Sequence, residues 1–249
     1  MSARSGLANV GLVAGRDLAS MFDVGIAYIY AIGFCLLANS IFMNEFFLTG
    51  TVDMTPFFAL LPLLFAFFVP AISMRIWAEE RKQRTIELLL TLPISPGQAV
   101  VAKFLASLAV VSLFLASSLP IPIMLGVLGD PDVGQVVSGY LGAFLFGALF
   151  LALGGLLSAL SADQIVAFVG ATLVGFLLVL SGDPRVVAVL DGLFANRALG
   201  SFLQDNLSVL PPYQAFVRGV LELSSLVYFL GLTAFFLFTT TLVVRHHRD

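Results

Sequence analysis

The chain has 249 residues, of which 59% are hydrophobic and 11% charged, and its mean hydropathy is +1.04. Soluble domains carry about 25% charged residues, so this composition excludes an ordinary soluble protein and predicts one polytopic membrane domain over residues 1–249. The net charge of −3 argues against nucleic acid as a partner.

The first predicted element is an amphipathic helix over residues 5–23. Apolar residues recur there at helical spacing, while Asn9, Arg16 and Asp17 occupy other parts of the helical wheel. This pattern is typical of a helix that lies in the cytoplasmic interface of a membrane, and a frayed cytosolic tail is the alternative.

Six apolar segments follow, each close to the 20 residues that a bilayer core needs. We expect transmembrane helices over residues 24–43, 55–76, 98–124, 136–160, 164–180 and 225–244, with loops at 44–54, 129–135 and 161–163. Residues 181–224 mix charges with apolar triplets and predict short extracytoplasmic helices at the membrane surface before span six. The expected fold is therefore all-α.

Two of these spans contain unusual residues. Pro62 and Pro70 lie inside span two, where proline removes backbone donors and can kink a helix. The kink is either tolerated in a packed helix or serves as a hinge. Lys103 lies near the cytoplasmic end of span three, and we expect its side chain to snorkel to the interface. Ser95 is expected to cap this span, with Pro96 at its first position.

Spans four and five each carry small residues at a spacing of four, which is typical of a helix-contact face. Packing within the chain is the favoured interpretation and a dimer seam is the alternative. The two sets are Gly139, Ala143 and Gly147, and Ala167, Ala171 and Gly175.

The densest run of charge, residues 77–95, lies between spans two and three. A charge in the centre of a membrane helix costs about 2.5–3.5 kcal/mol on insertion scales, so this run must face water. We interpret it as an elbow at which a soluble partner grips the protein, and a merely solvated stop-transfer cluster is the alternative. Its charged residues are Glu79, Glu80, Arg81, Lys82, Arg84 and Glu87.

Local signals divide the elbow into two helices. Glu80 and Arg84 have the favourable i,i+4 order, which predicts that span two continues as helix beyond the membrane. Thr85 is a plausible N-cap and Glu87 suits the first turn of a second, leucine-rich helix over 86–92, which Pro93 ends.

The distribution of Lys and Arg predicts the orientation. Six spans put both termini on one side, and nine of the twelve Lys and Arg residues share that side with the elbow. The positive-inside rule then makes the termini and the elbow cytoplasmic, with Arg185, Arg197 and Arg218 outside.

No catalytic constellation is recognisable in the sequence. The chain has no G-x-x-x-x-G-K-[ST] motif, no H-E-x-x-H and no G-x-S-x-G, and its two histidines are adjacent in the basic tail. No ionisable residue occurs at the midpoint of a predicted span, which disfavours an ion-coupled carrier. These absences predict a subunit that is not itself an enzyme, has no cofactor or metal of its own and takes energy from a partner.

The elbow and the residues before it resemble a known signature. The run F-F-V-P-A-I-S-M-R followed by W-A-E-E-R-K-Q-R-T-I-E-L-L-L-T-L-P-I-S resembles ABC transporter permeases of the type-2 exporter family, and residues 207–248 resemble its gliding-motility-associated branch. The resemblance implies a permease that pairs with a second copy or a similar chain in the inner membrane. It also implies a separate cytoplasmic ATPase that binds ATP and Mg, an extracytoplasmic accessory protein and contacts with membrane lipid.

In this family the elbow is a coupling helix that docks on the ATPase. The residues that the resemblance assigns to ATPase coupling are Glu79, Glu80, Arg81, Arg84, Thr85, Glu87, Leu88, Leu89 and Pro93. Glu80 and Glu87 would orient the helix by charge, and Leu88 with its neighbours would supply buried contact. Arg84 departs from the family, which usually has glycine before the motif threonine, and arginine favours continued helix.

Three other functions stay open: a non-transporting scaffold, an ATP-independent carrier or channel, and a membrane enzyme. The substrate is not readable from the sequence. Hydroxyl residues in the spans would suit an amphipathic cargo, or they bond to their own backbone four residues back. They are Ser107, Ser112, Ser117 and Thr172.

Overall fold

The computed structural model of the chain describes residues 3–23, 25–82, 95–193 and 199–246, and every structural statement below concerns these residues. They form helices and no strand, which confirms the all-α prediction. The long helices are α2 (Ile26–Thr49), α3 (Thr55–Ser73), α6 (Pro96–Ser117), α8 (Val133–Leu160), α9 (Gln164–Leu180) and α13 (Leu223–His246). The others are α1 (Ala3–Asp23), α4 (Arg75–Lys82), α7 (Pro120–Leu128), α10 (Pro184–Leu193), α11 (Leu199–Asn206) and α12 (Leu210–Val217).

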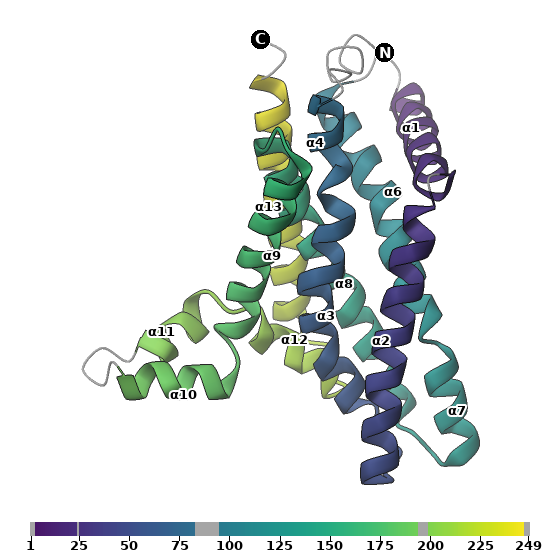
Figure 1. Cartoon of the computed structure of the whole chain (residues 1–249), viewed down its shortest axis with the longest axis vertical. Helices are drawn as coiled ribbons and strands as arrows, with labels where there is room; N and C mark the ends of the chain where they lie inside the picture. The colour runs from purple at the N-terminus through teal and green to yellow at the C-terminus, as the bar shows by residue number, and fades with distance from the viewer. Residues whose placement is uncertain (1–2, 24, 83–94, 194–198, 247–249) are drawn as a thin grey trace.

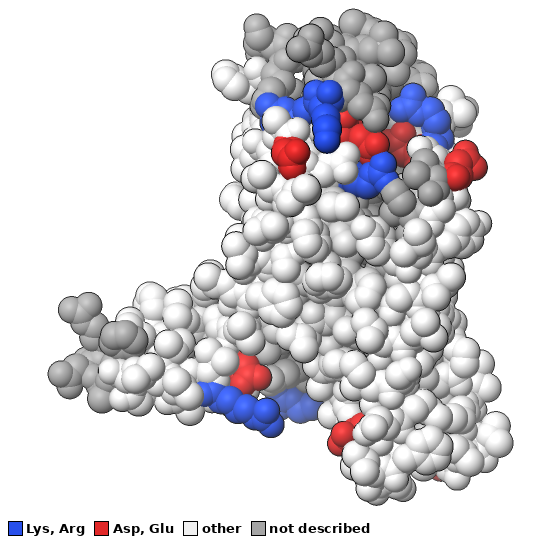
Figure 2. Space-filling view, in the orientation of Figure 1, with Lys and Arg blue, Asp and Glu red and all other residues white. Residues whose placement is uncertain are grey.

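The long helices run side by side along the molecule's long axis (Figure 1). The start of α1, the end of α4, the start of α6 and the end of α13 lie at one end of this bundle, which we name the terminal end. The hairpin of α10 and α11 projects sideways near the other end, the opposite end. Charged side chains gather at the two ends, and a broad band without charge separates them on the face shown in Figure 2.

Five helical segments are long and apolar enough to cross a membrane, and a sixth is reached only if α9 and α10, bent by 83°, count together. Multiple membrane-spanning helices are therefore confirmed, while the exact number of six stays a prediction. The fifth expected span has the bounds of α9, whose 17 residues begin after an Asp163 side chain that accepts hydrogen bonds from the Ile165 and Val166 amides.

Two expected loops are shorter than predicted. Helix α2 continues to Thr49, so residues 44–49 of the expected loop at 44–54 are helical. Gly50, in a left-handed conformation with φ 64°, ends the helix. Helix α8 begins at Val133 because the Asp132 side chain accepts from the Gly134 and Gln135 amides, so residues 133–135 are not loop. A left-handed Gly25, with φ 77°, similarly separates α1 from α2.

Span two continues as helix beyond the predicted membrane limit, as expected. Helices α3 and α4 together form an apolar segment over Thr55–Lys82, with Pro62 and Pro70 inside it and a break at Met74. The cap of span three is also confirmed. The Ser95 side chain accepts from the Gln98 amide, the Gln98 side chain accepts from the Ser95 amide, and Pro96 follows at the first helical position.

Both stripes of small residues pack within the chain, as favoured. A Cβ at Gly139 would collide with Phe58, and one at Gly147 would lie 2.7 Å from Val111 Cγ1. On α9, a Cβ at Gly175 would lie 3.0 Å from a ring carbon of Phe150. Helix α8 is consequently the central helix of the bundle, with 78% of its span window buried.

The segment 181–224 divides into two parts. Helices α10 and α11 form a hairpin in which Asp191 accepts hydrogen bonds from the Gly200 and Ser201 amides and from the Ser201 hydroxyl. Helix α12 instead packs into the bundle, where Tyr213 and Phe216 are buried. Short helices were predicted here, but placing all of them at the surface was wrong, because the apolar face of α12 packs against α8 and α13.

Candidate functional site

The charged side chains at the terminal end form neighbouring ion pairs and hydrogen bonds, and we name this group the charged cluster. Its members come from α1, α4 and α6, the three helices that meet where the chain enters and leaves residues 83–94. They are Arg16, Asp17, Arg75, Glu79, Glu80, Arg81 and Lys103.

Helix α4 carries four of these residues. Arg75 and Glu79 lie one turn apart and form a two-pronged pair, with Nε and Nη2 each 2.7 Å from a carboxylate oxygen. Such planar pairs are more rigid than single contacts, because both hydrogen bonds fix the orientation of the guanidinium group. The pair therefore stiffens the first turn of α4 beyond the break at Met74.

Lys103 connects three helices. Its Nζ lies 2.8 Å from Glu80 Oε1 on α4 and 3.2 Å from Asp17 Oδ2 on α1. The second contact is an ion pair without good hydrogen-bond geometry, and the ammonium group also lies 5.4 Å from the centre of the Trp77 ring. The Lys103 side chain is only 8% exposed.

The expectation that Lys103 snorkels to the interface was wrong. Helix α1 packs along α6 and covers the lysine, so its charge is neutralised inside the protein by two carboxylates. A buried charge is costly unless it is paired, and here the pairing makes burial tolerable.

Helix α4 is also fastened to the end of α8. The Ser158 hydroxyl accepts from the Trp77 and Ala78 amides, each at 3.1 Å, and donates to the Met74 carbonyl at 2.9 Å. Arg81 Nη1 donates to the Ala159 carbonyl at 2.8 Å, among the last carbonyls of α8 that have no partner within the helix. These contacts satisfy the backbone groups on either side of the break at Met74.

Three of the predicted coupling residues lie in the charged cluster. Glu79 and Glu80 pair with Arg75 and Lys103, and Arg81 binds α8, so their contacts within the chain differ from those of a solvated stop-transfer cluster. The other predicted residues lie outside the described part of the chain: Arg84, Thr85, Glu87, Leu88, Leu89 and Pro93.

Sequence reasoning missed the inner half of the cluster. Arg75 stands four residues before the predicted Glu79, at the spacing of a helical ion pair, and Lys103 was a lone charge within an apolar run, so Arg75 and Lys103 each carried a usable signal. The role of Ser158 had no signal, because an isolated serine in an apolar helix usually bonds to its own backbone.

The charged cluster consists of ion pairs and hydrogen bonds that link neighbouring helices. Within the described ranges, no three His, Cys, Asp or Glu side chains converge on a point that could hold a metal ion. Each charged side chain named above contacts a partner on its own or a neighbouring helix. Helix α4 is thus linked to α6 through Glu80 and to α8 through Arg81, and it is linked to α1 by way of Lys103.

A bundle of long apolar helices with charge confined to its two ends defines an integral membrane protein. A family model of ABC-2 family transporter proteins matches residues 39–245. The chain therefore belongs to the ABC-2 transporter family, whose members are membrane components of ABC transporters and are not themselves the ATPases. No curated protein matches the chain.

Proposed function

We propose that the chain is the permease subunit of an ABC exporter and that a separate cytoplasmic ATPase drives it through α4 and residues 83–94. One observation carries this proposal: α4 leads directly into residues 83–94 and contacts α1, α6 and α8 through the charged cluster and Ser158. A push on the segment thus reaches three helices of the bundle at once.

The break at Met74 supports a lever-like role for α4. Pro70 removes one backbone donor from α3, and Ser158 supplies hydrogen bonds to three backbone groups around the break. Helix α4 is therefore held by side chains from a neighbouring helix, and such contacts exchange more readily than the ladder of a continuous helix.

The remaining parts of the proposal follow from the family and the sequence. The ATPase would hold ATP and Mg, and the permease would act as a homodimer or with a similar chain, with an extracytoplasmic accessory protein as a further partner. The excess of Lys and Arg near the terminal end supports termini in the cytoplasm and a place in the inner membrane. The resemblance to the gliding-motility branch belongs to this proposal as well.

The test uses the full chain expressed with a candidate ABC ATPase from the same organism, purified and placed in liposomes. We expect the ATPase to co-purify and its hydrolysis rate to depend on the permease. Replacing Leu88 and Leu89 together by serine should lower co-purification and stimulation at least about tenfold, since burying one leucine side chain contributes about 1.5–3 kcal/mol. The matched control replaces Val220 and Leu221, an exposed apolar pair before α13, and should change neither.

Each other outcome rejects part of the proposal. Full stimulation in the Leu88/Leu89 variant would show that this segment is not the docking helix. Co-purification without any change in hydrolysis would favour a scaffold that anchors a soluble partner. Substrate movement without an ATPase would favour a carrier or channel.

A further inference from the structure

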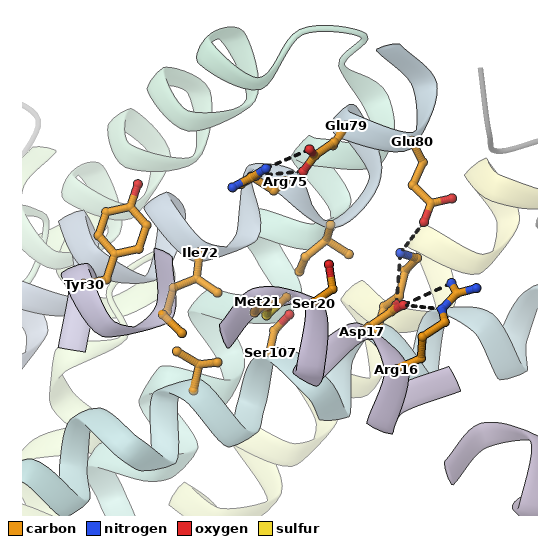
Figure 3. A pocket seen from close by; sticks show the side chains of 14 residues that line it. Arg16, Asp17, Ser20, Met21, Tyr30, Ile72, Arg75, Glu79, Glu80 and Ser107 are labelled. Atoms are coloured by element: carbon orange, nitrogen blue, oxygen red, sulfur yellow. Dashed lines mark hydrogen bonds and ion pairs between the residues drawn. The ribbon is translucent and has the colours of Figure 1, made fainter. Parts of the chain in front are cut away.

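A cavity of about 590 Å³ lies between α1, α2, the α3–α4 segment and α6, directly beside the charged cluster (Figure 3). Its size falls within the range of small-molecule sites, about 300–1,000 Å³. Five helices contribute to its walls, four before residues 83–94 in the sequence and one after them, so the cavity is a feature of the folded bundle and not of one loop.

The lining changes from charged to apolar along the cavity. Arg16, Glu79 and Glu80 line it at the terminal end, while Ile72 and Val110 line it deeper in the bundle. Val110 lies seven residues beyond Lys103 on α6, which is about 10 Å along the helix at 1.5 Å per residue. A ligand that fills this space therefore needs a polar head and an apolar body.

The charged part of the lining has three cationic and three carboxylate side chains, so its formal charge is zero. The cationic residues are Arg16, Arg75 and Lys103, and the acidic ones are Asp17, Glu79 and Glu80. Such a surface offers no net attraction to an anion or a cation. It suits a head group that carries both charges, with the negative group near guanidinium and the positive group near carboxylate.

Ser107 is a second, independent sign of a ligand. It lines the cavity one turn below Lys103 and is fully buried, yet its hydroxyl has no hydrogen-bond partner among the described residues. Ser112 and Ser117 on the same helix do bond to their own backbone carbonyls, at 2.9 and 2.7 Å. Because buried hydroxyls are rarely left without a partner, the Ser107 hydroxyl is available to a molecule in the cavity.

From these features we infer that the cavity binds one zwitterionic phospholipid with an amine head group, taken from the surrounding bilayer. The phosphate and amine meet the charged lining, an ester oxygen accepts from the Ser107 hydroxyl, and the start of an acyl chain lies along Ile72 and Val110. Helix α2 supports a lipid source, since Ala27 and Tyr30 line the cavity while Ile29 and Ile32 on the same helix are exposed. This inference does not depend on the ATPase or on the transported substrate.

The experiment measures lipid retained by the purified, delipidated full chain by native mass spectrometry. Phosphatidylethanolamine, phosphatidylglycerol and the soluble head group glycerophosphoethanolamine are added separately and in competition. We expect one phosphatidylethanolamine per chain, weaker binding of phosphatidylglycerol, and no competition by the soluble head group, because it lacks the apolar part.

Two variants and one control locate the binding. Ser107→Phe fills the cavity and should reduce phosphatidylethanolamine affinity at least about tenfold, the effect of losing about 1.4 kcal/mol. Ser107→Ala removes the hydroxyl and adds no bulk, and it should reduce affinity about threefold to tenfold, since one hydrogen bond is lost. Val101→Phe places the same ring on an exposed position of α6 and should bind as the wild type does.

Several results would overturn the inference. Unchanged binding in both Ser107 variants would place the lipid elsewhere, and an equal loss in Val101→Phe would show a general effect of the added ring. Equal binding of phosphatidylglycerol would reject the zwitterionic head group. Equal competition by glycerophosphoethanolamine would reject a lipid source. If Ser107→Phe does not fold, the Ser107→Ala variant decides the outcome.

Discussion

At the terminal end of the bundle, α1, α4 and α6 are joined through charged side chains, whereas at the opposite end α3, α8 and α12 are joined mainly through uncharged donors and acceptors. One carboxylate takes part there, since Asp53 Oδ1 lies 3.4 Å from the side-chain amide nitrogen of Gln135. There, Gln135 donates to the Thr55 hydroxyl at 2.7 Å and to the Val217 carbonyl at 3.1 Å. The Ser138 hydroxyl donates to the Phe216 carbonyl at 2.8 Å, and the Tyr213 hydroxyl donates to the Phe58 carbonyl at 2.8 Å.

The difference concerns how each end responds to a partner. Neutral bonds to main-chain carbonyls fix one arrangement of helices and depend little on salt or on approaching charges. Ion pairs such as Lys103 with Glu80 join side chains that are long and can exchange partners when a new charge approaches. We therefore expect the helices at the opposite end to keep one arrangement, and the ion pairs at the terminal end to be the contacts that a charged partner can rearrange.

Replacing Lys103 by methionine should give the largest loss of stability. It removes the cation that Asp17 and Glu80 share, both of them mostly buried, while Asp17 keeps its pair with Arg16, so we expect a cost of up to about 3–5 kcal/mol. Unfolding of the purified chain in a mild detergent measures the loss. The matched control is Lys82→Met, an exposed lysine on α4, for which we expect less than about 0.5 kcal/mol.

A triple variant sharpens this result. Adding Asp17→Asn and Glu80→Gln to Lys103→Met removes the two carboxylate charges that Lys103 balances in the wild type, so part of the lost stability should return. If the triple variant is as unstable as Lys103→Met alone, the loss comes from packing of the lysine stem and not from unpaired charge.

Replacing Ser158 by alanine should cost less, about 1–3 kcal/mol, because the buried Trp77 and Ala78 amides lose their acceptor. The chain has a single tryptophan, Trp77, so its fluorescence should report the change in the surroundings of α4 directly. Ser112→Ala, which removes a hydroxyl bonded only within α6, serves as the control. Equal effects of the two variants would contradict a special role for Ser158.

At the opposite end, Gln135→Leu should cost about 1 kcal/mol, the net value of an ordinary hydrogen bond. The variants at the two ends should also differ in activity. This variant should leave ATPase stimulation unchanged, whereas Ser158→Ala should lower it. Loss of stimulation in Gln135→Leu would show that the opposite end also moves during the cycle.

The smallest expected effect lies in the hairpin of α10 and α11. The Ser201 hydroxyl, with the Ser201 and Gly200 amides, holds the pKa of Asp191 below its usual range. A lowered folded-state pKa adds stability above the unfolded value, near pH 4, and this stability is lost as the pH falls through the folded pKa. Hydrogen exchange at residues 199–206, expressed as protection relative to the intrinsic exchange rate at each pH, should therefore show less protection in acid, and Asp191→Asn should show lower protection that no longer depends on pH in this range.

The sequence predicted those parts of the fold that depend on local signals. Ser95 with Pro96 marked the start of α6, and the length of the apolar run at 164–180 gave the bounds of α9. The position of α1 could not be predicted, because an amphipathic helix suits a lipid surface and a protein surface equally well. For the same reason the contact between Asp17 and Lys103 was missed, and the charge of Lys103 was assigned to the interface.

The candidate site was half predictable. Its outer residues, Glu79 to Arg81, follow from a charged run that cannot enter the bilayer. Its inner residues depend on which helices become neighbours, and a pattern in one segment does not contain that information.

The left-handed Gly25 limits how far a movement of α1 can travel. Because the chain between α1 and α2 adopts this conformation, which favours glycine, they are two separate helices and not one continuous helix. If a movement of α4 tilts α1 through Lys103, the bend at Gly25 allows α2 to keep its own angle to the bilayer. In the proposed mechanism, a movement of α4 is then carried by α6 and α8, which are unbroken helices that extend from the charged cluster into the bundle.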